Sequence, residues 1–390
     1  MNTNKNMLLI IIVMMCSLGL IATDIYIPVM PCIARYFHTN SHALQMTLSV
    51  YLLGLSCSQL IYGTLSDRFG RKKIAIIGCI IFSLATLACA FSTSISMLIV
   101  ARLFQAFGAA AGMTLGRAII GDVYTKTESA KIFATVFPII GLSPAISPVI
   151  GGFISHFASW HAVFGFVAFI GILLMGLIVI FLPETHKNAV SIHPMSIFKN
   201  YVSLLNQKIF WRYVLVPSVA YIVYFAYISE SPFIFSEFHY TALQIGFFYI
   251  SISFSYLIGN LIARKLLTYF TINQLIYIGY GFFIFGSLLM LMMNLLFIPS
   301  SENLIIPATV LTFGNGFLLP MGTAALITQF TKITGYASGL LGFFQLGAAA
   351  ASANIIGLVT QGNAVLLSIF MVAATIFGTL FFLLLRGKSA

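Results

Sequence analysis

The sequence predicts an all-α membrane protein with twelve transmembrane helices in two six-helix, pseudo-symmetric halves. Hydrophobic residues make up 60% of the chain and charged residues only 7%, with a mean hydropathy of +1.04. Soluble domains, by contrast, carry roughly a quarter charged residues. Apolar stretches of about 18 residues or more recur along the chain, and each is long enough to cross a bilayer core of ~30 Å. Basic residues cluster in alternate connections between these stretches, as they do in membrane proteins.

Charged residues, prolines and glycines mark the ends of the predicted helices. The first predicted helix resembles a signal peptide. Its apolar run, however, continues through Ile25–Pro31 and is longer than the apolar region of a signal peptide, which has about 7–15 residues. We therefore expect an uncleaved helix. The twelve helices are predicted at residues 7–34, 43–66, 73–92, 95–120, 129–155, 160–182, 209–235, 242–264, 272–297, 303–329, 336–360 and 363–385.

The longest polar connection divides the chain into three parts. We expect an N-terminal six-helix half over residues 1–183, a cytoplasmic linker over 184–208 and a C-terminal six-helix half over 209–390. No remaining segment is long enough to form a soluble domain, which excludes a soluble enzyme.

The basic residues predict an orientation in which both termini lie in the cytoplasm. With that orientation, seventeen of the 19 basic residues fall in cytoplasmic segments. Arg35 alone lies in an outer loop, and Arg102 lies inside a helix. A miscounted helix would remove this bias, so it supports both the number of helices and their direction. It also accounts for the formal net charge of +11 without a nucleic-acid partner.

The two halves share short sequence patterns. Residues 63–68 and 259–264 both read G-x-L-x-x-R, at an offset of 196, and Gly151 in the fifth helix corresponds to Gly357 in the eleventh. Parallel repeats related by an axis along the membrane normal are a feature of secondary transporters, whose substrate site lies between the repeats near the midplane.

Two charged residues of the N-terminal half lie deep within predicted helices. Asp24 is about ten residues from the outer end of the first helix, hence ~15 Å deep, and Arg102 lies ~10 Å inside the fourth. A carboxylate at such a depth costs at least ~2.5–3.5 kcal/mol and marks an ion or substrate path. We expect Asp24 and Arg102 to act in proton coupling; a static structural pairing is the alternative.

The seventh helix carries an acid behind aromatic side chains. Tyr224 and Tyr227 fall close to one helical face, and Glu230 follows. Aromatic walls with one carboxylate suit a lipophilic cation. The alternative is an interfacial position, because Glu230 is about one turn from the outer surface and tyrosines favour interfaces.

Two further segments predict conformational roles. The connection after the second helix contains Asp67, which can bind a helix N-terminus, and we expect a latch formed by Gly63, Asp67, Arg68, Gly70 and Arg71. In the fifth helix, prolines remove backbone hydrogen bonds and neighbouring glycines allow close approach of another helix. We expect an outer seal or hinge there, formed by Pro144, Pro148, Gly151 and Gly152.

These motifs resemble signatures of the major facilitator superfamily across essentially the whole chain. Residues 63–72, GTLSDRFGRK, resemble its loop signature G-x-L-a-D-R-x-G-R-[KR]. Residues 102–108, RLFQAFG, resemble R-x-x-Q-G-x-G with Ala106 in place of Gly. Residues 147–152, SPVIGG, resemble the antiporter signature G-P-x-x-G-G with Ser147 in place of Gly.

The sequence resembles the signatures of one branch of that superfamily more specifically. TDIYIPVMP at residues 23–31 resembles the first-helix signature of the Bcr/CflA-type drug-resistance branch, as do SESPF at 229–233, GFLLP at 316–320 and PET at 183–185. The resemblance implies drug:proton antiport with Asp24 as the proton carrier and Arg102 in coupling. We expect the substrate to contact Asp24, Tyr26, Gln105, Tyr224, Tyr227 and Glu230. Cys16 stands where some drug antiporters carry a second acid.

The sequence therefore predicts a proton-coupled exporter of small lipophilic compounds in the bacterial inner membrane. The alternatives are export of an endogenous metabolite, such as a siderophore or an amino acid derivative, and an uncoupled facilitator. The five cysteines and seven histidines lack metal-ligand spacing, and no cofactor is predicted. The expected partners are the substrate, protons and the lipid bilayer, with the protein functional as a monomer.

Overall fold

The computed structural model describes residues 5–125, 128, 132, 142–185, 194–330 and 333–385. Two predicted segments fall partly outside this range. They are the first part of the fifth helix, residues 129–141 apart from 132, and the linker residues 186–193. Within the described residues the chain is all-helical and contains no strand.

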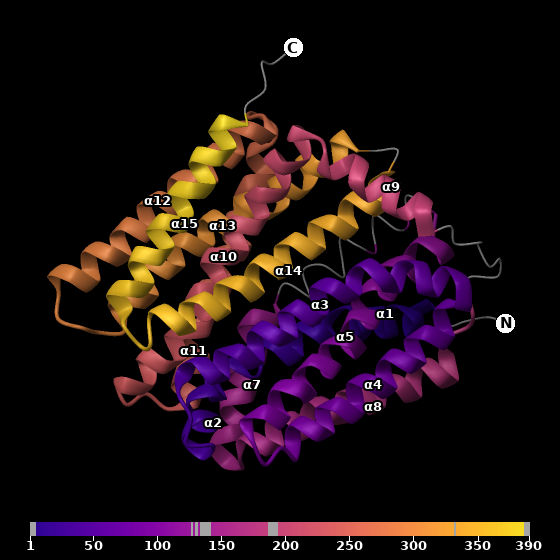
Figure 1. Cartoon of the computed structure of the whole chain (residues 1–390), viewed down its shortest axis with the longest axis horizontal. Coiled ribbons are helices and arrows are strands. Elements are labelled where there is room, and N and C mark those ends of the chain that lie inside the picture. The colour runs from indigo at the N-terminus through magenta and orange to yellow at the C-terminus, as the bar shows by residue number, and fades with distance from the viewer. Residues whose placement is uncertain are drawn as a thin grey trace. The chain divides into compact units, whose positions relative to one another are not determined.

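The helices follow one another with short connections (Figure 1). They are α1 (Lys5–Asp24), the 3-10 turn η1 (Ile27–Val29), α2 (Met30–Tyr36), α3 (Ser41–Phe69), α4 (Arg71–Ala90), α5 (Ile95–Val123), α7 (Ser143–Phe157), α8 (Trp160–Phe181), α9 (Pro194–Leu205), α10 (Lys208–Glu237), α11 (Ala242–Leu266), α12 (Ile272–Leu296), α13 (Glu302–Gln329), α14 (Thr334–Val359) and α15 (Ala364–Leu384).

Eleven segments among the described residues are long and apolar enough to span a membrane. The first comprises α1, η1 and α2 together, Asn6–Tyr36, and contains an 18-residue window with a mean hydropathy of 2.5. α7, at the position of the predicted fifth helix, is described over 15 residues. The all-α membrane fold predicted from composition and apolar periodicity is therefore confirmed.

Polar side chains at several helix starts satisfy backbone N–H groups that have no partner within the helix. The Ser94 hydroxyl accepts from the Met97 N–H at 3.2 Å, and Thr271 forms a reciprocal capping box with Gln274. The Asn363 side chain accepts from the N–H groups of Val365 and Leu366. These caps define where α5, α12 and α15 begin.

The chain forms two compact units. The first contains Met1–Thr39, Val50–Ile192 and Thr241–Gly246, and the second contains Asn40–Ser49, His193–Tyr240 and Phe247–Ala390. The first residues of α3 therefore pack with the second unit, and the first residues of α11 pack with the first. The predicted division into halves at residues 184–208 stays a prediction.

Small residues on α5 hold the first unit together. Gly108, Gly112 and Gly116 recur every four residues and lie on one face of the helix. A Cβ on Gly108 would lie 2.3 Å from the Phe82 backbone nitrogen of α4, and one on Gly112 would lie 2.6 Å from the Met15 carbonyl of α1. This close packing of backbones is typical of membrane helices, which gain no hydrophobic driving force from lipid.

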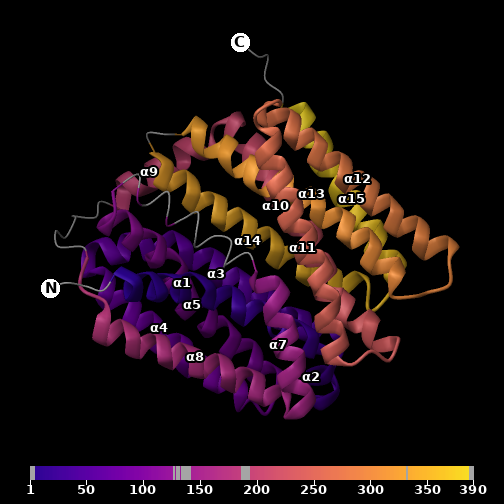
Figure 2. The same cartoon turned by 180° about the vertical axis from the view of Figure 1, so that it is seen from behind.

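The second unit is built around α10, which packs against α13, α14 and α15, while α12 packs against α13 and α15 (Figure 2). A Cβ on Gly322 of α13 would lie 2.7 Å from the Pro217 ring of α10, and one on Gly378 of α15 would lie 2.6 Å from Val219. Glycines thus allow α10 to occupy the centre of this unit.

Candidate functional site

The first transmembrane segment is interrupted at Asp24. α1 ends at Asp24, and η1 and α2 continue the crossing after a turn at Ile25 and Tyr26. Pro28 explains the interruption, because it has no N–H for the Asp24 carbonyl and its ring clashes with that carbonyl in a continuous helix. Irregular backbone at membrane depth is tolerated where it is buried in protein or lines a cavity, and it often marks a binding site.

Asp24 is 4% exposed, and its hydrogen-bond partner in the described part of the chain is uncharged. The Ser143 hydroxyl of α7 donates to its Oδ2 at 3.0 Å, and Ser143 lies 3.2 Å from the Ser147 hydroxyl. Among the described residues, no basic nitrogen lies within 4.0 Å of the Asp24 carboxylate. Asp24 and Arg102 therefore form no direct ion pair, which was the alternative interpretation of these two residues, and α7 supplies the contact to Asp24.

Arg102 is fully buried in the first unit between two aromatic rings. Its guanidinium carbon lies 4.0 Å from the ring centre of Tyr51 and 4.8 Å from that of Tyr26. Its Nη1 donates to the Ala22 carbonyl at 3.1 Å and to the Gln105 Oε1 at 2.7 Å. The helix interruption thus gives Arg102 an acceptor, and cation–π contact stabilises the charge in place of a carboxylate.

A hydrogen-bonded chain continues from Arg102 to α4. Gln105 is fully buried and donates through Nε2 to the Thr86 hydroxyl at 2.9 Å. Tyr51 donates from its hydroxyl to the Gly19 carbonyl at 2.8 Å. The structure therefore brings Tyr26, Arg102 and Gln105 together, as expected for one site. It adds Tyr51 and Thr86, which no sequence motif singled out.

The predicted seal residues of α7 contact the Asp24 segment and the start of α11. A Cβ on Gly151 would lie 2.0 Å from the Ile25 carbonyl oxygen, and one on Gly152 would lie 2.5 Å from the Ala242 carbonyl oxygen. Pro144 occupies the first turn of α7, where a missing N–H costs nothing, and Pro148 lies against Gly246 of α11. The two glycines are therefore required for the close packing of α7 against both segments.

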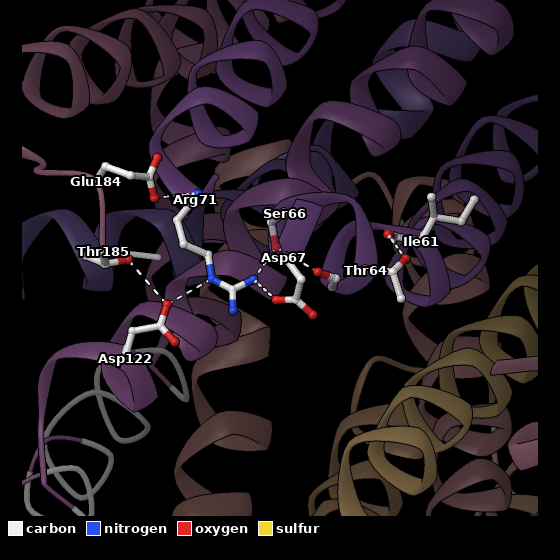
Figure 3. Close-up of polar contacts among 9 residues, drawn as sticks. Ile61, Thr64, Ser66, Asp67, Arg71, Asp122, Glu184 and Thr185 are labelled. Atoms are coloured by element: carbon white, nitrogen blue, oxygen red, sulfur yellow. Dashed lines mark hydrogen bonds and ion pairs between the residues drawn. The ribbon is translucent and has the colours of Figure 1, made fainter. Parts of the chain in front are cut away.

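The connection between α3 and α4 holds a second polar cluster, centred on Arg71 (Figure 3). The Arg71 guanidinium forms an ion pair with Asp67 and another with Asp122 of α5, the latter at 2.9 Å, and it also donates to Ser66. Arg71 is 6% exposed. Asp67, Arg71 and Asp122 form what we call the Arg71 cluster, which joins the ends of α3, α4 and α5.

Glu184 binds the N-terminus of α4 within this region. Its carboxylate accepts from the Arg71 N–H at 2.8 Å and the Lys72 N–H at 3.1 Å, where the helix dipole favours an anion. Gly70 makes the approach feasible, because its φ of 94° suits glycine and a Cβ would lie 2.5 Å from Glu184 Oε2. Sequence reasoning expected Asp67 to bind a helix N-terminus and did not assign roles to Glu184 or Asp122.

The remaining latch residues differ in their surroundings. Arg68 is exposed, with its guanidinium carbon 5.1 Å from the Phe69 ring centre. A Cβ on Gly63 would have nothing within 4 Å. Among the predicted latch residues, Asp67 and Arg71 therefore carry the polar contacts between the ends of α3, α4 and α5.

Removing either acid of the Arg71 cluster is expected to shift the conformational balance of the transporter. Asp122→Ala should have the larger effect, because the Asp122 side chain is 20% exposed and that of Asp67 is 39% exposed, and exposed pairs are weak. A contribution of ~0.5–1 kcal/mol corresponds to roughly a two- to fivefold change. Labelling rates of single cysteines on each face, on a cysteine-free background, measure it. Glu302→Ala, an exposed acid far along the chain, is the control, and unchanged labelling in both variants would contradict a latch.

In the second unit, Glu230 is fully buried and hydrogen-bonded on both oxygens. Gln45 donates through Nε2 to Oε2, and also to the Ser229 carbonyl at 3.1 Å. The Gly362 N–H, in the turn between α14 and α15, donates to Oε1. Gly362 has a φ of 90°, which favours glycine. We call Gln45, Glu230 and Gly362 the Glu230 cluster; its donors are uncharged.

The tyrosines before Glu230 line a small pocket with α13 and α15. Its walls are formed by Val223, Tyr224, Tyr227, Ala308, Leu311, Thr312, Asn315 and Met371. Asn315 is 4% exposed, and its Oδ1 accepts no hydrogen bond from the described residues. Glu230 is not among the lining residues. The structure thus separates Tyr224 and Tyr227 from the acid with which sequence reasoning grouped them.

Comparisons with known proteins agree with these features. The family model described as Major Facilitator Superfamily matches residues 8–353. The multidrug resistance protein MdtL of Shewanella oneidensis is 28% identical over 375 residues, which cover 94% of each chain. A bicyclomycin resistance protein homolog of Haemophilus influenzae is 28% identical over 254 residues, 64% of each chain.

Solved structures share the fold at low sequence identity. A POT family transporter crystallised with 5-aminolevulinic acid superposes with a TM-score of 0.79 at 12% identity, covering 98% of this chain and 97% of the other. At this identity the likeness concerns the fold alone.

Proposed function

Since this chain belongs to the Major Facilitator Superfamily, we propose that it exports small lipophilic compounds across the bacterial inner membrane in exchange for protons. Members of this family are membrane transporters and not enzymes. The similarity to bicyclomycin-resistance and multidrug-resistance proteins is consistent with the Bcr/CflA-type drug-resistance branch. That similarity supports drugs as the substrate class.

The observation that carries proton coupling is the position of Asp24. Its carboxylate is 4% exposed, ends an interrupted helix, and receives a hydroxyl and no cationic nitrogen within 4.0 Å among the described residues. A passive pore gains little from a buried acid, whereas a proton-exchanging transporter needs a group that can be charged in one state and neutral in another. Arg102 and Gln105 lie beside the same interruption, and we assign them to coupling through the Ala22 carbonyl.

Alternating access supplies the proposed cycle. A proton from the outer side binds Asp24, and substrate from the cytoplasm or inner leaflet competes with it. The tight packing of Gly151 and Gly152 supports a seal on one side, and the Arg71 cluster supports a latch on the other. The basic residues favour cytoplasmic termini, and we assign a protein that functions as a monomer within the bilayer.

Two alternatives remain distinct from this proposal. Export of an endogenous metabolite would use the same proton-coupled mechanism and is distinguished by the substrate alone. An uncoupled facilitator would move substrate only down its gradient and without net proton movement, and replacing Asp24 would then leave that downhill transport unaffected. The similarity to multidrug-resistance proteins favours drug export over export of an endogenous metabolite. The buried acid favours a proton-coupled exporter over an uncoupled facilitator.

The polar contacts in the second unit favour uncharged substrate groups there. Tyr224, Tyr227, Thr312 and Asn315 line the small pocket of this unit, while Glu230 accepts hydrogen bonds from Gln45 and Gly362. We therefore assign Tyr224 and Tyr227 to substrate contact and Glu230 to holding α3, α10 and the α14–α15 turn together.

A susceptibility and accumulation screen in an efflux-deficient host tests this assignment. Export of at least one lipophilic drug by the wild type is the first expected result. Glu230→Gln should then reduce export of cationic and matched neutral compounds alike, by about tenfold, because hydrogen bonds to a charged group contribute about 1.5–3 kcal/mol each. Glu302→Gln, which removes an exposed acid of the same half, serves as the control. A selective loss of cation export would show instead that Glu230 binds the substrate charge.

A further inference from the structure

Arg212 of α10 is buried without an acidic partner. It is 7% exposed, and no carboxylate among the described residues lies within 4.0 Å of its guanidinium nitrogens. Its Nε is buried and donates to no acceptor in the described part of the chain. The guanidinium carbon lies 4.7 Å from the Phe382 ring centre and 5.5 Å from that of Tyr213. Arg71, by comparison, has two acids, and the Nη1 of Arg102 has two oxygen acceptors, although the Nε and Nη2 of Arg102 also donate to no acceptor among the described residues.

Tyrosines from two helices surround the same phenylalanine. Ring centres lie 6.4 Å from Phe382 for Tyr213, 5.3 Å for Tyr277 and 6.0 Å for Tyr280. The hydroxyls of Tyr277 and Tyr280 are buried and find no hydrogen-bond partner among the described residues. Tyr213 donates to Asn273 at 3.2 Å. One cation and two unpartnered hydroxyls from α10 and α12 therefore gather around a single residue of α15.

A guanidinium in this environment needs an anion. Arginine carries five N–H donors in a planar fork and does not lose its proton in proteins. Contact with an aromatic face recovers only part of the desolvation cost of such a charge, about 2 kcal/mol in a desolvated site. The fork matches carboxylate and phosphate oxygens. No Asp or Glu side chain of the described chain lies in reach, so an external anion is a suitable complementary group.

The position of the cluster indicates which anion. Arg212 lies four residues after Lys208, where α10 begins, and Phe382 lies two residues before Leu384, where α15 ends. At a rise of 1.5 Å per residue, both are within ~6 Å of a helix end. The distribution of basic residues favours a cytoplasmic location for this end, and Trp211 beside Arg212 is typical of the interface. Basic pockets between helices at this depth bind lipid head groups.

We propose that Arg212, Tyr277 and Tyr280 form a binding site for a phosphate group, supplied by an anionic phospholipid or by free phosphate. The Arg212 fork donates to the phosphate oxygens, and the two tyrosine hydroxyls donate to the remaining ones. Bound phosphate would neutralise the buried charge and join α10, α12 and α15 at one end of the second unit. The site is separate from Asp24 and does not depend on proton coupling.

Ligand-dependent stabilisation of the purified protein tests the site. The apparent melting temperature in detergent is followed during titration with phosphatidylglycerol, phosphatidylcholine or inorganic phosphate at constant ionic strength. The wild type is expected to gain stability from one of the two anionic additions and not from phosphatidylcholine. Arg212→Gln should weaken that apparent affinity about fivefold, since one basic residue near a membrane surface contributes about 1 kcal/mol. Arg264→Gln removes an exposed arginine at the end of α11 and should change it by less than about twofold.

The results distinguish a lipid site from a site for soluble phosphate, and they distinguish both from the absence of a site. A phosphatidylglycerol response that depends on Arg212 assigns a lipid site, and an inorganic phosphate response assigns a site for soluble phosphate. No anion response in the wild type, or equal losses in Arg212→Gln and Arg264→Gln, overturns the proposal. If Arg212→Gln does not fold, Arg212→Lys and Tyr280→Phe replace it. A loss of about threefold or more in either then supports the site, because lysine lacks the planar fork, and no loss in both overturns it.

Discussion

Asp24→Asn is expected to abolish uphill export while leaving the folded protein in the membrane. Asparagine is nearly the same size and can still accept from the Ser143 hydroxyl, so the contact between α1 and α7 survives. It cannot gain and lose a proton, so an imposed pH gradient no longer drives transport. Drug accumulation in an efflux-deficient host should rise to the level of cells without the transporter.

Two variants control for structural damage at this position. Ser143→Ala removes the hydroxyl that donates to Asp24 and keeps the carboxylate, so proton-driven export should persist. Asp24→Glu keeps a titratable group and should retain part of the activity. Full uphill export by Asp24→Asn, at an expression level equal to that of the wild type, would remove Asp24 from the coupling mechanism.

Gly151→Ala should cause the largest structural effect of any single methyl group added to the first unit near the site. The added Cβ would lie 2.0 Å from the Ile25 carbonyl oxygen, and this neighbour is backbone that cannot rotate away. Overpacking costs about 1–3 kcal/mol or more. Because Ile25 follows Asp24, α7 would also have to move away from the interrupted segment. We expect a lower apparent melting temperature and loss of most transport activity.

A matched glycine in the same unit provides the control. A Cβ on Gly165 of α8 would have nothing within 4 Å, so Gly165→Ala should be tolerated and, through its better helix propensity, slightly stabilising. Equal melting temperatures and equal transport for Gly151→Ala and Gly165→Ala would contradict the close packing of α7 against Ile25.

The positions of the helices could be predicted from the sequence because a bilayer imposes a strong constraint. A crossing needs about 20 apolar residues and must satisfy its backbone internally, so apolar runs between charges correspond closely to helices. The predicted helix at 242–264, for example, is α11 at Ala242–Leu266. The interruption after Asp24 was not predicted, although Pro28 gives its physical cause.

The identity of the candidate site residues was easier to predict than their partners. Asp24 and Arg102 stand out because a charge is rare within an apolar run, but depth along a helix does not give direction around its axis. Asp24 therefore contacts α7, and Arg102 contacts Tyr26 and Tyr51. Glu230 shows the same limit, since its partner Gln45 is 185 residues away in the chain.

Partners of loop residues were missed for a related reason. Asp122 and Glu184 lie at helix ends, where acids are common, and nothing local distinguishes them from solvated charges. Their roles follow only from the arrangement that brings both to Arg71. Arg212 was counted among the cytoplasmic basic residues, and only the structure reveals that it is buried without an acid.

Substrate-driven proton movement in proteoliposomes tests the central claim most directly. Purified wild type and Asp24→Asn are reconstituted at equal density with a pH-sensitive dye inside, and a drug identified in the accumulation screen is added. The proposed mechanism predicts that drug addition produces a proton flux opposite to drug movement in the wild type and none in Asp24→Asn. Drug transport by the wild type without a proton flux, or an equal flux in both proteins, would contradict it.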